Sequence, residues 1–183
     1  MTSDPMEKAL TPVGQRFVLH WGEMGWRWGV NRTVAQIHAL LFLVGRPLNS
    51  DEIVSILRVA RSNVSNSLRE LLNWNLVRVV HLVSDRRDHY ETDQDPWDLL
   101  RTIIRGRKSR EFDPTLKVLR ECVGDPAMSE LDDSAQKRVR ETLILMESLS
   151  SWTDDMLNLE TNTLKKLIKL GAKVQGLLRP GSR

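Results

Sequence analysis

The sequence predicts a mainly α-helical protein with one small β-hairpin, and three observations lead to this fold class. Apolar residues recur at steps of three and four in several segments, which is the spacing of amphipathic helices. Alternating β-branched residues occur in one stretch, Leu76–Val83, and turn-forming residues follow it. A long final run of apolar steps is typical of a coiled coil. We therefore expect residues 1–94 to contain the hairpin and residues 95–183 to form a helical dimerisation region.

Composition narrows the function classes only loosely. The 183 residues are 40% hydrophobic, and the net charge of +3 is too small to indicate a nucleic-acid partner by itself. No apolar run approaches the roughly 20 residues of a membrane span, and the N-terminus lacks the pattern of a signal peptide. The single cysteine, Cys122, fits a reducing compartment, and we expect it to be buried on a helix. These features predict a cytoplasmic protein without a membrane partner.

The first predicted helix follows Thr11, which is the expected N-cap, and has Pro12 at its first position. It should break near Gly29. An apolar stripe with aromatic rings runs along one face: Phe17, Trp21, Met24 and Trp28. Gly22 and Gly25 lie in the same helix, and each weakens it by up to about 1 kcal/mol. Large rings beside glycines indicate close packing against another segment or another subunit.

Two short helices joined by a tight turn are predicted next. A core helix spans about Thr33–Leu43 and ends at a Gly-Arg-Pro sequence. Asn49 and Glu52 then have the spacing of a capping box, which begins a short helix that ends near Leu57. The helix at Arg61–Trp74 begins four residues later. This arrangement is a helix-turn-helix motif.

The helix at Arg61–Trp74 has two chemically different faces. Its apolar residues share one face of a helix with 3.6 residues per turn: Val64, Leu68, Leu71 and Leu72. The other face carries serine, asparagine and arginine, although serine and asparagine are poor helix formers that a solvated face usually avoids. Such side chains can meet base edges and phosphates in a major groove. The predicted DNA-binding residues are Ser50, Arg61, Ser62, Asn63, Ser65, Asn66 and Arg69, with an ordinary solvated surface as the alternative.

A basic β-hairpin is predicted after this helix. Leu76–Val83 would form the first strand, Ser84–Asp88 the turn, and His89–Thr92 the returning strand. The turn would carry Arg86 and Arg87 at the tip of the hairpin, where they could reach a minor groove. The alternative is a solvated turn in which the arginines pair with neighbouring aspartates. A helix-turn-helix followed by a basic hairpin predicts a winged helix-turn-helix domain.

The C-terminal part is predicted to be entirely helical. A helix opens at Pro96 and contains the basic run Arg101–Arg110, which has no acidic residue. We favour a solvated face for this run over contact with DNA phosphates, and its role stays open. A further helix is expected to begin with Asp113 as its N-cap and to end at Gly124.

Residues 134–178 show the pattern of one long helix, with an irregular step near Thr163. A single apolar stripe of this length is too long for the small helices nearby to cover, so we expect it to pair two subunits. The predicted dimer interface consists of Leu145, Leu149, Trp152, Met156, Leu159, Leu167, Leu170 and Val174. The alternative is an intrachain hairpin against residues 114–123.

These motifs together resemble the MarR superfamily of winged-helix regulators, and more specifically its GbsR-type branch. The stretches that carry the resemblance are Pro47–Ile53, Ala60–Leu71, Trp74–Val77 and Asp85–Tyr90, supported by Trp28–Arg32 and Gln36–Leu43. Asn75 and Ser84 stand where many members have glycine, and Ala60 stands where a serine N-cap is common; we expect altered local details. The resemblance implies a homodimeric transcriptional regulator, often a repressor, on a pseudo-palindromic operator in double-stranded DNA. Some relatives sense choline or glycine betaine.

The predicted function is sequence-specific DNA binding by a homodimeric repressor, with helix 61–74 in the major groove and wing 83–88 near the minor groove. The alternative is a winged-helix module that binds proteins and does not read DNA. An enzyme is disfavoured because the sequence contains no nucleophile constellation or phosphate loop, and its four histidines lack metal spacing. We therefore expect no cofactor and no metal, and surface positions for His81 and His89.

Three tryptophans raise the question of a small-molecule effector. Trp21, Trp26 and Trp28 lie near the expected junction between the DNA-binding and dimerisation regions. Aromatic rings can hold a quaternary ammonium group by cation–π attraction. Ordinary packing is the favoured interpretation of these rings, and a site for a small-molecule effector is the alternative.

Overall fold

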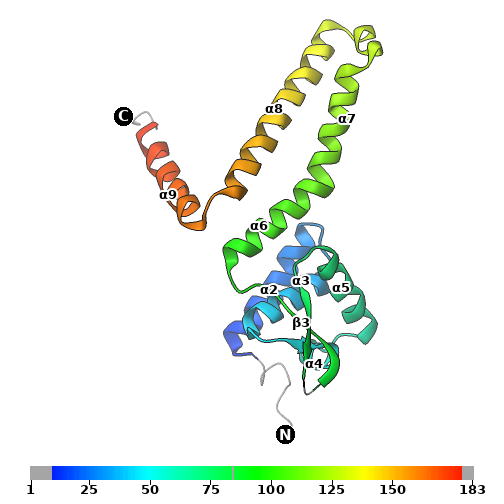
Figure 1. Ribbon diagram of the computed structural model, residues 1–183, viewed down its shortest axis with the longest axis vertical. Coiled ribbons are helices and arrows are strands. Elements are labelled where there is room, and N and C mark those ends of the chain that lie inside the picture. Colours follow the sequence, from blue (N-terminus) through cyan, green and yellow to red (C-terminus); the bar gives the residue numbers. More distant parts are fainter. Residues whose placement is uncertain (1–9, 84, 179–183) are drawn as a thin grey trace. The chain divides into compact units, whose positions relative to one another are not determined.

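The computed structural model describes residues 10–83 and 85–178, without the side chains of residues 172–178. Its contacts divide the chain into two compact units, Met1–Ile103 and Ile104–Arg183 (Figure 1). The first unit combines helices with a small antiparallel sheet, and the second is helical. The predicted fold class is confirmed. The division lies within a helix that crosses it, and the functional boundary after residue 94 stays a prediction.

Two helices at the start of the first unit pack closely. Helix α2 (Pro12–Arg27) begins as predicted, because the Thr11 hydroxyl accepts a hydrogen bond from the Gly14 N–H at 3.3 Å. Helix α3 (Arg32–Val44) follows after Gly29, whose φ of +79° favours glycine. A Cβ added to Gly25 would lie 2.5 Å from the Cβ of Ala35 in α3. The close packing predicted from the glycines therefore occurs within one chain.

The core of the first unit gathers apolar side chains from α2, α3, both helices of the helix-turn-helix and the edge of the sheet. The largest fully buried side chains are Ile37, Leu40, Leu41, Leu48, Ile53, Leu71, Val18 and Val64. Phe17 and Trp21 of the predicted aromatic stripe are partly buried against this cluster. The apolar face of the helix at Arg61 is thus anchored to the core, as its spacing predicted.

The helix-turn-helix consists of α4 (Ser50–Leu57) and α5 (Arg61–Asn73). The predicted capping box is present: the Asn49 side chain accepts from the Glu52 N–H at 3.0 Å, and the Glu52 carboxylate accepts from the Asn49 N–H at 2.9 Å. Arg58 ends α4 in the left-handed conformation, with a φ of 53°. Ala60 precedes α5 without a side-chain cap, which agrees with its departure from the usual serine.

The sheet contains three antiparallel strands in the order β1-β3-β2. Strand β1 (Leu48–Asn49) pairs with β3 (Asp85–Glu91), which also pairs with β2 (Arg78–Leu82). The sequence pattern did not predict β1, because two residues are too few to show alternation.

The predicted turn of the hairpin is wrong in position. Leu82 pairs with Asp85, so the chain reverses between these two residues, and Ser84 lies outside the described residues. Arg86 and Arg87 consequently lie within β3 and not at a turn. A turn was predicted here because Asp85–Asp88 has the composition of a turn. Pairing with β2 instead holds this segment extended.

Helical backbone runs from α6 (Pro96–Arg107) through a π-helical turn (Lys108–Phe112) into α7 (Asp113–Gly124). Asp113 is itself helical, and its N–H donates to the carbonyl of Lys108, five residues earlier. The expectation that Asp113 is an N-cap is therefore wrong. The wider turn lies just before Pro114, which lacks an N–H and would crowd a regular α-helical turn.

The prediction of one long C-terminal helix is wrong. Helix α8 (Asp133–Asn158) ends where Leu159 becomes extended, with a ψ of 146°, and α9 (Thr161–Leu178) begins two residues later. This break is close to the irregular step in the apolar spacing. A 3₁₀ turn (Pro126–Glu130) links α7 to α8, and these two helices pack side by side (Figure 1). The alternative interpretation, an intrachain helical hairpin against residues 114–123, is therefore present for α8.

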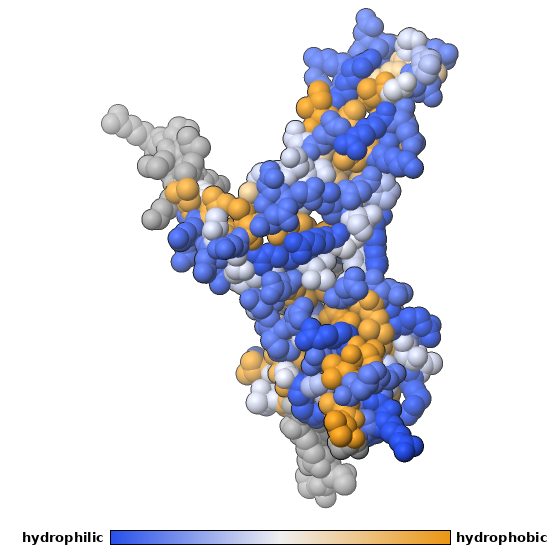
Figure 2. Space-filling model, in the orientation of Figure 1, coloured by the Kyte–Doolittle hydropathy of each residue, from blue (hydrophilic) through white to orange (hydrophobic). Residues whose placement is uncertain are grey.

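The α7–α8 hairpin leaves much of the predicted dimer stripe uncovered. Leu145, Leu149 and Trp152 of α8 are 58%, 43% and 61% exposed, and Figure 2 shows apolar patches on the surface of this helix pair. Leu167 and Leu170 of α9 are also exposed, Met156 and Leu159 are partly buried, and the side chain of Val174 lies outside the described residues.

Two further findings concern expectations from composition. Cys122 is exposed on α7 and is not buried as expected. Among the described residues, no helix combines the length and the apolar character needed to cross a membrane.

Candidate nucleic-acid interface

The exposed face of α5 carries all six of the residues predicted for DNA contact on that helix. Arg61, Ser62, Asn63, Ser65, Asn66 and Arg69 are exposed, whereas the apolar residues between them are buried or partly buried. Ser67, which is polar, is buried at 4% exposure, so the polar face is narrower than composition alone suggests. Ser50, at the first position of α4, is only partly buried.

An ion-pair network joins α4, α5 and β3 on this side of the unit. One oxygen of the Asp51 carboxylate accepts a hydrogen bond from Arg61, and the other lies 3.5 Å from a guanidinium nitrogen of Arg87. The Arg87 Nε also donates to both oxygens of Asp85, at 2.9 Å each. The sequence singled out both arginines, but it gave no signal that one acidic residue of α4 contacts them both.

The ion pairs in this network favour the charged forms of both Asp85 and Arg87. Hydrogen bonds from the Arg87 guanidinium lower the pKa of the Asp85 carboxyl to about 2. The same hydrogen bond raises the pKa of the Arg87 guanidinium, and the negative charge of Asp51 adds to this effect. Arg86, which points from the neighbouring position of β3, is exposed. Arg87 is therefore restrained by ion pairs, whereas Arg86 is exposed at the neighbouring position of the strand. The sequence predicted the same role for both arginines.

His89 lies buried under the wing, with 4% exposure, although we expected a surface position. Its Nδ1–H donates to the Arg87 carbonyl at 2.9 Å, because a carbonyl can only accept. Its Nε2 can then accept from the Asn49 side-chain amide at 3.5 Å. His81 is exposed, as expected. The pairing of β1 with β3 accounts for the difference, since it covers His89 and leaves His81 on the outer strand.

A buried hydrogen-bond chain fixes the base of the wing to α3. The Thr92 hydroxyl donates to the Leu76 carbonyl at 2.7 Å, so it accepts from the Nε2–H of His38 at 3.2 Å. Burial lowers the pKa of His38 to about 4, which keeps the ring neutral near pH 7. The wing is thus attached to the core by polar contacts at its base and by ion pairs near its other end.

The three tryptophans have different surroundings. The Trp21 ring stacks on Phe17, with centroids 5.2 Å apart and planes at 18°, and packs against the core. Trp26 and Trp28 are 70% and 65% exposed.

The charges of the basic run largely have acidic or carbonyl partners. Arg101 is buried and pairs with Asp98 at 3.0 Å. Lys108 lies 2.9 Å from a carboxylate oxygen of Asp113 and 3.2 Å from one of Asp154, and the hydrogen bond to Asp113 raises the pKa of its ammonium group. Arg105 donates to a carbonyl of α8 at 3.2 Å. Several of these residues therefore stabilise the helices that carry them.

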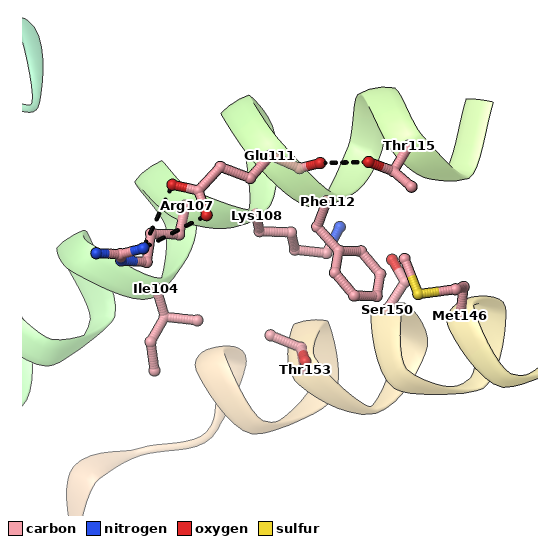
Figure 3. A pocket seen from close by; sticks show the side chains of 9 residues that line it. All are labelled: Ile104, Arg107, Lys108, Glu111, Phe112, Thr115, Met146, Ser150 and Thr153. Carbon is pink, nitrogen blue, oxygen red and sulfur yellow. Dashed lines mark hydrogen bonds and ion pairs between the residues drawn. The ribbon is translucent and has the colours of Figure 1, made fainter. Parts of the chain in front are cut away.

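A cavity of about 320 Å³ lies between the π-helical turn and α8. Figure 3 shows the Phe112 ring directed toward Met146 and Ser150, with Ile104 and Thr153 at the other end. The charged residues on its wall are paired, since Arg107 lies 3.4 Å from Glu111 and Lys108 contacts Asp113. Its remaining surface is mainly apolar. Within the part of the chain that the structure describes, no three potential metal ligands converge.

The first unit combines a helix-turn-helix with a β-hairpin wing, which places its fold in the class of winged-helix proteins. The second helix of the motif exposes a face rich in serine, asparagine and arginine. Residues 28–88 match the model of the MarR family. The putative HTH-type transcriptional regulator YvaV of Bacillus subtilis (strain 168) is 22% identical over 158 residues, which cover 84% of this chain and 86% of that protein.

Two solved structures extend the comparison. A crystal structure of a transcriptional regulator has a TM-score of 0.64 at 19% identity and covers 80% of this chain and 96% of its own. MepR, a transcription regulator of the Staphylococcus aureus multidrug efflux pump MepA, has a TM-score of 0.37 at 15% identity, over 74% of this chain and 91% of its own. The first likeness shows the fold. The family match and the relative support a DNA-binding regulator of the MarR superfamily.

Proposed function

We propose that this protein is a sequence-specific DNA-binding transcriptional regulator that acts as a homodimer, with α5 of each subunit in a major groove. The main support for this proposal is the polar face of α5, where every residue predicted to contact DNA is exposed. The apolar residues between them are anchored in the core. Arg61, Ser62 and Asn63 occupy the first turn, which is the part of a recognition helix that meets base edges. Ser50 and Arg69 suit phosphate contacts.

The wing is the second element of the proposal. Residues 83–88 would lie near the minor groove, with Arg86 and Arg87 contributing from β3. Arg86 is exposed, whereas Arg87 has to exchange carboxylate partners for phosphate. We therefore rank the wing below α5 in its contribution to affinity.

Dimerisation is proposed to use the exposed apolar residues of the helical unit. Leu145, Leu149 and Trp152 form part of the uncovered stripe on α8, and exposed apolar side chains also occur on α9. Contiguous apolar surface on a protein commonly marks an interface. A dimer would place two recognition helices on the two halves of a pseudo-palindromic operator.

The sign of regulation and the branch of the superfamily are proposals of the same kind. The GbsR-type resemblance of Pro47–Ile53 and Ala60–Leu71 supports a repressor in the compartment that holds the DNA, the cytoplasm. It also supports an osmoprotectant effector, with Trp21, Trp26 and Trp28 as candidates for a quaternary ammonium site. Calorimetry with choline and with glycine betaine tests the effector: heat of binding and a change in operator affinity support it, and the absence of both rejects it.

The regulatory function is tested by footprinting the full-length protein on the promoter next to its gene and by measuring duplex binding at several salt concentrations. We expect a protected pseudo-palindromic site and an affinity that falls steeply with salt, because a dimer that neutralises about 6–10 phosphates releases as many counterions. A protein-interaction module would give no footprint and no salt-sensitive duplex binding, and that result would reject the proposal.

A further inference from the structure

Asp51 lies between two arginines that come from different DNA-facing elements. Arg61 is the first residue of α5, and Arg87 lies in β3 of the wing. Each contacts a separate oxygen of the Asp51 carboxylate, Arg61 through a hydrogen bond and Arg87 at 3.5 Å. One acidic side chain therefore links the recognition helix to the wing.

The backbone holds Asp51 in place independently of the arginines. Asp51 is in the first turn of α4, and its N–H donates to the Asn49 side chain at 3.0 Å. The same Asn49 caps the helix through Glu52 and reaches His89 beneath the wing. The capping box thus fixes the backbone of Asp51, and the two arginines meet a carboxylate that extends from this fixed position.

We propose that Asp51 is a specificity-determining residue: it positions Arg61 and Arg87 for the operator and opposes binding to other DNA. This inference rests on the proposed regulatory function. Asp51 is not among the residues predicted to contact DNA. Its proposed role is to position Arg61 and Arg87, which are among them.

The two effects follow from different parts of the binding free energy. Binding to non-specific duplex depends on how many phosphates the protein neutralises and little on geometry, so a carboxylate beside the arginines weakens it. Binding to the operator requires donors at defined positions, and a restrained arginine loses less conformational entropy when it contacts a base or phosphate. Features that disfavour the wrong partner are a general route to specificity.

The restraint is weak enough for DNA to displace it. The side chains of Arg61, Arg87 and Asp51 are 71%, 56% and 45% exposed. Exposed ion pairs of this kind contribute little to the stability of a protein. Either guanidinium can therefore exchange the carboxylate for a phosphate when the duplex arrives.

The test is to substitute Asp51→Asn in the full-length protein and to measure affinity for the footprinted operator and for a scrambled duplex across a salt series. We expect affinity for the scrambled duplex to rise about fivefold, with a salt slope steeper by about one or two units per dimer. Operator affinity should stay level or fall, so that the ratio of the two affinities drops. Asp51→Glu, which keeps the charge, should restore most of the ratio.

Asp88→Asn is the matched control, because it removes the same charge from the exposed wing while Asp88 contacts His81 at 3.7 Å and not the two arginines. It should raise both affinities by a similar factor and leave their ratio unchanged. Asp51→Ser provides a second neutral variant that suits the first turn of a helix, in case the asparagine variant unfolds.

The outcomes separate this inference from the proposed function. If the wild-type protein shows no preference for any operator, the regulatory function fails. If it shows a preference and Asp51→Asn changes both affinities equally, as Asp88→Asn does, Asp51 acts only through its charge and the inference is overturned. Unchanged affinities in both neutral Asp51 variants would overturn it as well.

Discussion

The buried histidine His38 should make the stability of this protein depend on pH. His38 is 4% exposed, and its Nε2–H donates a hydrogen bond to the Thr92 hydroxyl. Burial lowers the pKa of the ring from 6.5 to about 4. The unfolded chain therefore binds more protons than the folded protein between these two values, and stability falls as the pH decreases through that window. The pKa of Asp85 is lowered from 3.8 to about 2, so its contribution to stability is lost only at lower pH.

The substitution His38→Gln should remove this pH dependence. From pH 7 to pH 5 we expect the wild-type protein to lose about 2 kcal/mol through His38, following the standard linkage relation. The variant is less stable at pH 7 because its packing is altered, but it should lack this part of the decrease. Urea unfolding of both proteins at the two pH values measures the difference. Equal decreases in the two proteins would show that His38 is not the responsible group.

At the residue scale, the sequence predicted the polar face of α5 but not the partners of its side chains. The exposed positions of these polar residues follow from helical periodicity, which is a local property. The burial of His89, the exposure of Cys122 and the position of Asp51 between two arginines depend on contacts between separate elements. Periodicity within one element carries no information about such contacts.

At the scale of elements, caps and glycines predicted most of the first unit correctly. Thr11 and Asn49 begin their helices as expected, because a cap is a local hydrogen bond. The start of β3 was placed too late, because pairing with β2 holds Asp85–Asp88 extended where local composition favoured a turn. The break between α8 and α9 was missed, although it lies close to the irregular step in the apolar spacing.

The close contact between α2 and α3 gives a prediction at this scale. Gly25→Ala would put a methyl group 2.5 Å from the Cβ of Ala35, and such overpacking costs about 1–3 kcal/mol. Ala35→Gly in the same protein removes the opposing methyl and should recover part of this loss. Urea unfolding of both single variants and the double variant forms a cycle. Strictly additive losses would mean that the two positions do not compete for space.

At the scale of the whole molecule, the uncovered apolar residues of α8 lead to a direct prediction about dimerisation. Replacing Leu149 and Trp152 together by Glu should give a monomer by light scattering and weaken operator binding at least tenfold, because one subunit contacts one half-site. Val118→Glu is the control on α7, where an equally apolar residue is 55% exposed outside the predicted stripe. A dimer that survives the double substitution would place the interface elsewhere.

If α5 is the recognition helix, substitutions in its first turn should abolish most of the operator affinity. Arg61 and Asn63 lie exposed in the first turn of this helix, away from the core, so Arg61→Ala with Asn63→Ala should leave the fold and the oligomeric state intact. Operator affinity measured by titration at fixed salt should fall by at least a hundredfold, since each lost base contact costs about 1–3 kcal/mol. A properly folded double variant that binds the operator as tightly as the wild-type protein would contradict the assignment of α5 as the recognition helix.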